Sequence, residues 1–140
     1  MTLFCHLPVC RILRASRDGA SALRLGAEVK RDHARCSACR TVSRSVHSRY
    51  HRQAADLPTS GQVVRLTLTI RRFYCHEPAC ARRTFAERLP RLLDRYAQRT
   101  HRLADAQVRT ALALGATPAV RLLPHLGARP SKPLDGGVWG

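Results

Sequence analysis

The chain has 140 residues, enough for one ordinary domain or two very small ones, which excludes a large enzyme core. Its 25 Lys and Arg residues against 9 Asp and Glu residues give a formal charge of +16. A cationic surplus of this size is typical of a protein that binds a polyanion, and nucleic acid is the first candidate. The absence of any apolar run of about 18 residues predicts a soluble protein without a membrane span.

The first thirty residues favour a β-hairpin. Residues 9–15 and 23–30 have the composition of strands, and the apolar residues of the second segment fall on alternate positions. Asp18-Gly19 between them is a strong hairpin signal. The basic, acid-poor start also resembles a mitochondrial transit peptide, but the alternation is that of a strand rather than of an amphipathic helix. We therefore expect a hairpin that leads into Cys36.

Four cysteines form two closely spaced pairs. Cys36 and Cys39 make a C-x2-C pair, and Cys75 and Cys80 make a C-x4-C pair, with thirty-five residues between the two pairs. Four thiolates at about 2.3 Å complete a tetrahedral zinc site, and pairs on two turns are the usual way to supply them. A fully coordinated ion has no position for water or substrate. The sequence therefore predicts one structural Zn²⁺ per chain.

Other readings of the cysteines stay open. Disulfides or incidental thiols are the alternatives, and the arginines that flank the first pair favour thiolates with or without a metal. His33 and His76 lie near the ligand cysteines in the sequence and could replace one of them. Cys5 and Cys10 form another C-x4-C pair, which we interpret as two thiols, with a second metal site as the alternative.

The region between the two zinc pairs contains the clearest strand. Residues 64–70 alternate strictly between apolar and polar, whereas residues 42–50 form a weaker strand and residues 57–61 supply the turn between the two. Arginines with interleaved aromatic residues in this region suit phosphate contact and base stacking, and a merely solvated charged face is the alternative. The candidate nucleic-acid-binding residues are Arg44, His47, Arg49, Tyr50, Arg52, Arg71, Arg72, Arg82 and Arg83.

Helical patterns follow Cys80. Thr100 is a suitable N-cap for a helix that ends near Gly115, with an apolar stripe formed by Leu103, Val108, Ala111 and Leu112. A second helix is expected with Thr117 as N-cap and Pro118 at its first position, running toward Gly127 and kinking or ending at Pro124.

Two short successive helices suggest a helix-turn-helix or part of one. Five arginines between Arg88 and Arg102 have spacings of three and four, which would place them on one face if that stretch is helical. The fold class expected is α+β. Residues 1–90 form an N-terminal β-hairpin and a small β-rich four-cysteine zinc ribbon, residues 91–127 a helix-turn-helix-like segment, and residues 128–140 an irregular tail.

Three segments resemble the ISL-three family of insertion-sequence transposases. They are CSACRTVSRSVHSRYHRQAADLP, VRLTLTIRRFYC and CARRTFAERLPRLLDRYAQRTHRL, so the resemblance extends from residue 36 to about residue 127. It implies that Cys36, Cys39, Cys75 and Cys80 bind zinc. It also implies that the ribbon and the helices after it recognise double-stranded DNA, the terminal inverted repeats of the element, in the bacterial cytoplasm.

The resemblance also bears on catalysis. In such transposases a much longer RNase H-like domain with a carboxylate triad follows and performs strand transfer. No acidic residue of this chain can be assigned to that triad, and the ending SKPLDGGVWG has the look of a frameshift or truncation scar. We therefore expect a truncated fragment that is not an enzyme and that could associate with a full-length transposase. The alternatives are an RNA- or ribosome-associated basic zinc ribbon and an enzyme subunit completed by another chain.

Overall fold

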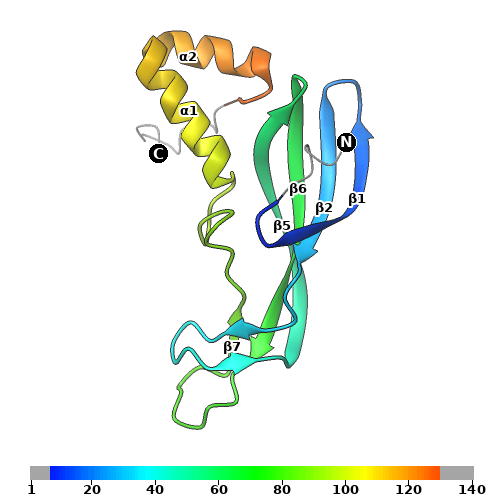
Figure 1. The fold of residues 1–140 in the computed structure, drawn as a ribbon, viewed down its shortest axis with the longest axis vertical. Helices are drawn as coiled ribbons and strands as arrows, with labels where there is room; N and C mark the ends of the chain where they lie inside the picture. Colours follow the sequence, from blue (N-terminus) through cyan, green and yellow to red (C-terminus); the bar gives the residue numbers. More distant parts are fainter. Residues whose placement is uncertain (1–6, 130–140) are drawn as a thin grey trace.

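The computed structural model describes residues 7–129 and places seven strands before two helices (Figure 1). The elements in chain order are β1 (Cys10–Asp18), β2 (Ala22–Val29), β3 (Ala34–Arg35), β4 (Val42–Ser43), β5 (Val46–Thr59), β6 (Gln62–Tyr74), β7 (Thr84–Ala86), α1 (His101–Leu114), α2 (Ala116–Leu122) and the 3₁₀ turn η2 (Leu123–Leu126). No helix within the described residues is long and apolar enough to cross a membrane.

Two antiparallel hairpins lie side by side to form the main sheet. β1 pairs with β2 and β5 with β6, and the hairpins join through parallel pairing of β2 with β6, so that the strand order is β1-β2-β6-β5. The β5–β6 ribbon continues beyond the end of β2, where β7 pairs with β6 (Figure 1). The short strands β3 and β4 form a separate two-stranded sheet near this end.

The N-terminal hairpin is confirmed, and the second hairpin corrects the sequence prediction. The strand expected over residues 42–50 is split into β4 and β5, and β5 runs on to Thr59. The turn predicted over residues 57–61 is therefore wrong in extent. It contracts to Ser60 and Gly61, whose φ angles of 50° and 76° are of the kind that a two-residue type I′ turn requires.

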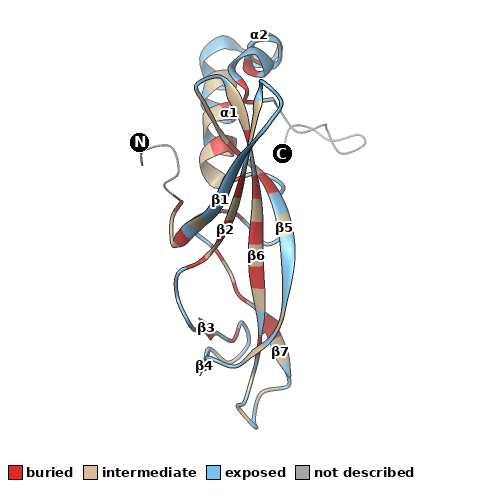
Figure 2. Ribbon diagram, turned by 90° about the vertical axis from the view of Figure 1, so that its right-hand side faces the viewer, coloured by how far each residue is buried: buried red, intermediate tan, exposed pale blue. Residues whose placement is uncertain are grey.

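The ribbon has buried side chains on opposite faces at its two ends. In the main sheet, the even-numbered residues from Val64 to Ile70 of β6 are buried and pack with Leu25 of β2. Leu89, Leu92 and Leu93 complete this cluster. Phe73, an odd-numbered residue of β6, is buried at the other end. Because side chains alternate along a strand, Phe73 and Ile70 lie on opposite faces. Figure 2 shows buried segments at intervals along β6.

The helices begin and end largely where the capping residues predict. The Thr100 side chain accepts a hydrogen bond from the amide of Leu103, and α1 ends at Gly115. The predicted start of the second helix is wrong by two residues, because α2 begins at Ala116. It ends at Leu122. The 3₁₀ turn that follows begins at Leu123, contains Pro124 in its first turn, and closes at Gly127 with a φ of 79°.

Residues 88–100, whose arginines would share one face if the segment were helical, do not form a helix. Irregular chain covers the sheet there, so the arginines of this stretch share no helical face. The predicted apolar stripe of α1 is also only partly buried, because Val108 and Leu112 are 53% and 81% exposed, whereas Leu103 and Gln107 are buried. α1 and α2 meet directly at Gly115, and the helix-turn-helix stays a prediction. Of the expected irregular tail, residues 130–140 lie outside the described residues.

Asp56 of β5 anchors α1 to the sheet. Asp56 is buried, and its carboxylate accepts hydrogen bonds from the Thr100 hydroxyl at 2.7 Å and from Arg102 Nε at 2.7 Å. A second ion-pair contact joins Arg102 to the other carboxylate oxygen. The backbone of Ala55 adds bonds to Gln98 and Thr100 at 2.9 Å each. The first turn of α1 is thereby held against the edge of β5.

Candidate metal centre and nucleic-acid interface

The four predicted ligand cysteines converge at the end of the ribbon. The Sγ atoms of Cys36 and Cys80 are 3.9 Å apart, those of Cys39 and Cys75 are 3.6 Å apart, and all four lie within 4.8 Å of one another. A tetrahedron with metal–sulfur bonds of about 2.3 Å has sulfur–sulfur edges of about 3.8 Å. The sulfur positions thus have the spacing of a tetrahedral Zn²⁺ site.

Two tight turns hold these sulfurs. In the first, between β3 and β4, the Arg40 amide bonds to the Cys36 carbonyl at 2.9 Å, and Arg40 has a φ of 68°. The Ala38 amide points at Cys36 Sγ from 3.4 Å. In the second, between β6 and β7, the Cys80 amide bonds to the Glu77 carbonyl at 3.0 Å. Amide hydrogen bonds to sulfur stabilise the thiolate form that a metal needs.

The pKa values of the ligand cysteines are shifted in opposite directions. Hydrogen bonding by the hydroxyl and the backbone amide of Thr41 lowers the pKa of Cys39 to about 6. At Cys75 the Glu77 amide lowers the pKa, but burial and the neighbouring thiols outweigh it and raise the pKa to about 12. Four thiolates this close repel one another, so all four ionise together only when a cation such as Zn²⁺ compensates their charge.

A small apolar cluster surrounds the sulfurs. Phe73 of β6 and Phe85 of β7 stack with their ring centroids 5.8 Å apart, and both are almost fully buried. Ala34 and Cys36 are the other buried members, and the ligand cysteines pack against them. Because so little apolar surface is buried here, we expect the metal to hold the two turns together.

Seven of the nine candidate nucleic-acid-binding residues lie exposed on or near the metal-bearing end of the ribbon. They are Arg44, His47, Arg49, Tyr50, Arg72, Arg82 and Arg83. An exposed row of aromatic rings lies beside them. The ring centroids of His47 and Tyr74 are 4.9 Å apart in an edge-to-face contact, and those of Tyr74 and His76 are 5.9 Å apart in a stacked contact. Tyr74 and His76 were not among the predicted residues, although their position beside Cys75 could have indicated them.

The other two candidates serve the fold instead. Arg52 donates hydrogen bonds to the carbonyls of Asp94 and Ala97 at 2.7 and 2.8 Å, which holds the irregular segment onto β5. Arg71 donates to both oxygens of buried Glu87, at 3.1 and 2.9 Å. Its side chain is only 16% exposed. These two guanidinium groups are already occupied by partners within the chain.

The chain has too few acidic residues to neutralise all of its arginines. Seven of the eight acidic residues in the described part of the chain are in salt bridges with Arg or His. The eighth, Glu77, accepts a hydrogen bond from the Ala79 amide. Exposed arginines without an acidic partner are thus left along the ribbon and beside the second metal-binding turn.

The open face of the main sheet is a second cationic surface. Arg24 of β2 and Arg65 of β6 are opposite each other in the parallel register, and both are exposed, although Arg24 also forms a salt bridge with Asp18. Arg14 of β1 lies across Gly26, where a Cβ would approach Arg14 Cγ to 2.9 Å. Alternation in residues 64–70 predicts a partly cationic face, but the pairing of β2 with β6 that assembles it is not evident from local patterns.

Cys10 is separate from the metal centre. It is 4% exposed in the core of the main sheet, and burial, together with the charge of Glu87, raises the pKa of its thiol to about 11. Such a thiol is unreactive at neutral pH. Its sequence neighbour in the third cysteine pair, Cys5, lies outside the described residues, so the interpretation of that pair stays a prediction.

Comparison with known protein families finds a match in the metal-bearing part of the chain. Residues 32–80 match a family described as the zinc-finger of transposase IS204/IS1001/IS1096/IS1165. Neither the comparison with curated proteins nor that with solved structures found a match. The family match and the sulfur geometry agree, and Cys36, Cys39, Cys75 and Cys80 form a structural zinc site.

Proposed function

We propose that this chain is a DNA-binding zinc-ribbon module of an insertion-sequence transposase, which binds the double-stranded terminal repeats of its element in the bacterial cytoplasm without catalysis of its own. The match of residues 32–80 to a transposase zinc finger carries the proposal. The ribbon presents its exposed arginines to the phosphates, and the zinc site holds the turn that bears Arg82 and Arg83.

The charge distribution supports a polyanionic partner. Most acidic side chains in the described part of the chain, residues 7–129, are already in ion pairs. The charge of the excess arginines can therefore be neutralised only by anionic groups from outside the chain. Arginine binds phosphate bidentately and also stacks on bases, so the same side chains suit both elements of DNA contact. A structural zinc ion and paired carboxylates also fit a module that binds rather than cleaves, since two-metal chemistry requires carboxylates free to hold the ions.

A salt titration tests the proposal. Each phosphate contact releases counterions, so the affinity for duplex DNA should fall with a log–log slope of roughly 0.9 per contact. Six contacts would reduce the affinity about a thousandfold between roughly 50 and 200 mM salt. Arg83→Ala should lower the slope by about 1. Arg109→Ala is the matched control, because Arg109 is exposed on α1 and already paired with Asp105 at 2.8 Å.

Two results would contradict the proposal. A flat salt response would show that the arginines do not contact phosphates. A structured RNA that displaces the duplex at matched salt would favour the alternative, an RNA-associated basic zinc ribbon, since both nucleic acids suit the charge. An inverted-repeat duplex should compete better than a scrambled duplex of the same length if the repeats are the target.

A further inference from the structure

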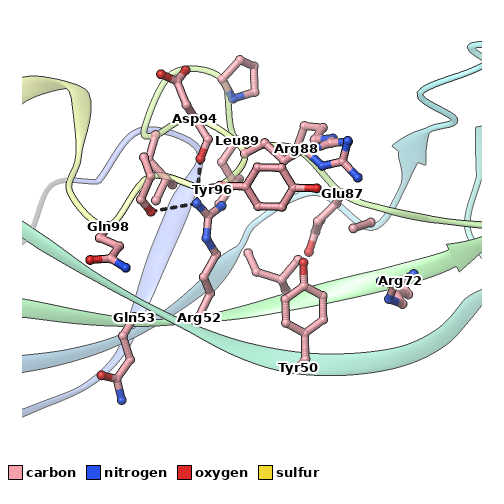
Figure 3. A pocket seen from close by; sticks show the side chains of 16 residues that line it. Tyr50, Arg52, Gln53, Arg72, Glu87, Arg88, Leu89, Asp94, Tyr96 and Gln98 are labelled. Atoms are coloured by element: carbon pink, nitrogen blue, oxygen red, sulfur yellow. Dashed lines mark hydrogen bonds between the residues drawn. The ribbon is translucent and has the colours of Figure 1, made fainter. Parts of the chain in front are cut away.

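A pocket of about 580 Å³ lies between the β5–β6 ribbon and the irregular segment after β7 (Figure 3). Tyr50 and Arg72 belong to its ribbon wall, and Arg88, Arg95 and Tyr96 belong to the opposite wall. Figure 3 shows the rings of Tyr50 and Tyr96 on these two facing walls. The volume is within the range of roughly 300–1,000 Å³ that is usual for pockets that hold small organic ligands.

The pocket carries positive charge that the chain does not neutralise. Glu87 and Asp94 contribute two carboxylates to the lining. Glu87 is bound to Arg71, and Asp94 Oδ1 lies 2.9 Å from His101 Nε2. In the part of the chain that the structure describes, no salt bridge or side-chain hydrogen bond engages the three remaining guanidinium groups of this lining, those of Arg72, Arg88 and Arg95. These groups are available for an anionic ligand.

The two tyrosines offer flat surfaces to a ligand. Tyr96 is 80% exposed and Tyr50 is 40% exposed, so neither residue is buried in the core. A guanidinium group lies over one face of each ring: Arg95 is 4.9 Å from the Tyr96 centroid, and Arg72 is 5.9 Å from that of Tyr50. Rings flanked by cations form the platforms on which proteins stack unpaired bases while they hold the adjoining phosphates.

We propose that this pocket receives an unpaired base of a DNA strand, stacked on Tyr50 and Tyr96, with the adjoining phosphates held by Arg72, Arg88 and Arg95. The inference deepens the proposed function and rests on it for the identity of the partner as DNA. A paired base has both faces covered by its neighbours and cannot enter a concave site, so the ligand is a base at a strand end or one turned out of the duplex.

The surface beyond the pocket supports the same ligand. Tyr74 lies two residues after Arg72 on the same face of β6, and its ring is 41% exposed between those of His47 and His76. A strand that leaves the pocket in this direction meets a second aromatic platform. This path leads toward the metal-binding turns, where Arg82 and Arg83 stand.

The proposal is tested by measuring the affinity of the chain for three labelled DNAs of equal length at one salt concentration. The first is fully paired, the second has one extrahelical thymidine, and the third has a single-stranded tail. We expect one or both of the DNAs with unpaired bases to bind about tenfold more tightly than the paired duplex, in the range for one base stacked on an aromatic ring. The bulged and tailed DNAs distinguish a turned-out base from a strand end.

Variants locate the effect. Tyr96→Ala should abolish the preference for unpaired bases and leave paired-duplex affinity unchanged, while Tyr96→Phe should keep the preference. Leu112→Ala is the matched control, because Leu112 is 81% exposed on α1. An adenine analogue whose emission falls on stacking, placed at the unpaired position, should be quenched by the parent chain and not by Tyr96→Ala.

The outcomes separate the two proposals. If the chain binds paired duplex with no preference for unpaired bases, the proposed role of the pocket is wrong and the proposed function stands. The same conclusion follows if a preference for unpaired bases survives Tyr96→Ala. Binding of tailed or bulged DNA that depends on Tyr96, without binding of paired duplex, supports the pocket and overturns the duplex-binding function. Failure of all three DNAs to bind overturns both.

Discussion

Replacing Asp56 with Ala tests how α1 is attached to the sheet. The substitution removes the acceptor of the Thr100 hydroxyl and of Arg102 and leaves both donors at a junction where the Asp56 side chain is 2% exposed. Loss of one partner of a buried ion pair costs about 3–5 kcal/mol. Because the Arg102 side chain is 36% exposed, water recovers part of this cost, and we expect a loss of about 2–3 kcal/mol.

Urea unfolding followed by circular dichroism measures this loss. Asp105→Ala is the control, since it removes an exposed i,i+4 pair with Arg109 and should cost no more than about 0.5 kcal/mol. A loss at Asp56→Ala as small as that of the control would refute the reasoning. So would an unchanged rate of amide hydrogen exchange in α1, because the first turn of this helix depends on the junction.

The same junction predicts a pH dependence. Burial raises the pKa of Asp56, but hydrogen bonds from Arg102 and Thr100 outweigh it, so the pKa in the folded chain lies below its usual value. The carboxylate therefore stabilises the fold above about pH 4 and loses this effect as the pH falls through the lowered pKa. The stability difference between the parent chain and Asp56→Ala should shrink in acid, and a difference that grows would contradict the assignment.

Further predictions concern the metal and the two neighbouring arginines of β6. Elemental analysis of the reduced, folded chain should find about one zinc per chain, and Cys75→Ser or a chelator should unfold the metal-bearing end; a folded, metal-free chain would contradict this. Arg71→Ala should cost about 3 kcal/mol in urea unfolding because it leaves Glu87 buried without its partner. Arg72→Ala should change stability by no more than about 0.5 kcal/mol and should weaken DNA binding instead. Equal stability losses at the two positions would contradict this division of roles.

The zinc site and the regular elements follow from local signals. The spacing of the four cysteines specifies the metal ligands because each pair needs only a tight turn to bring its sulfurs together. Alternation in residues 64–70 specifies β6, and the Asp18-Gly19 turn specifies the first hairpin. Thr100 marks the start of α1 because its side chain satisfies a free amide of the first turn. These features depend on neighbours in the sequence.

The features that the sequence did not predict depend on contacts between residues far apart in the chain. β5 is longer than its own pattern indicates because β6 offers it a partner along its whole length. The helical spacing of arginines after Arg88 gives way to irregular chain because Leu89, Leu92 and Leu93 are held in the core of the sheet. Arg52 and Arg71 have the sequence context of DNA contacts, and only the tertiary structure shows which partners occupy their side chains.

The change of buried face along β6 explains how one ribbon supports two different sites. Between Ile70 and Phe73 the apolar cover passes from one side of the ribbon to the other, and the Arg71–Glu87 pair lies at this change, joining β6 to the chain after β7. The side left uncovered beyond Ile70 is the side that carries Arg72 and Tyr74. Zinc holds the apolar cluster on the opposite face, so the ribbon can present cations and aromatic rings to a ligand there without burying them. The main-sheet core fixes Tyr50 through its pairing with Ile70, independently of the metal. Loss of zinc should therefore disturb Arg82 and Arg83 more than the ribbon wall of the pocket.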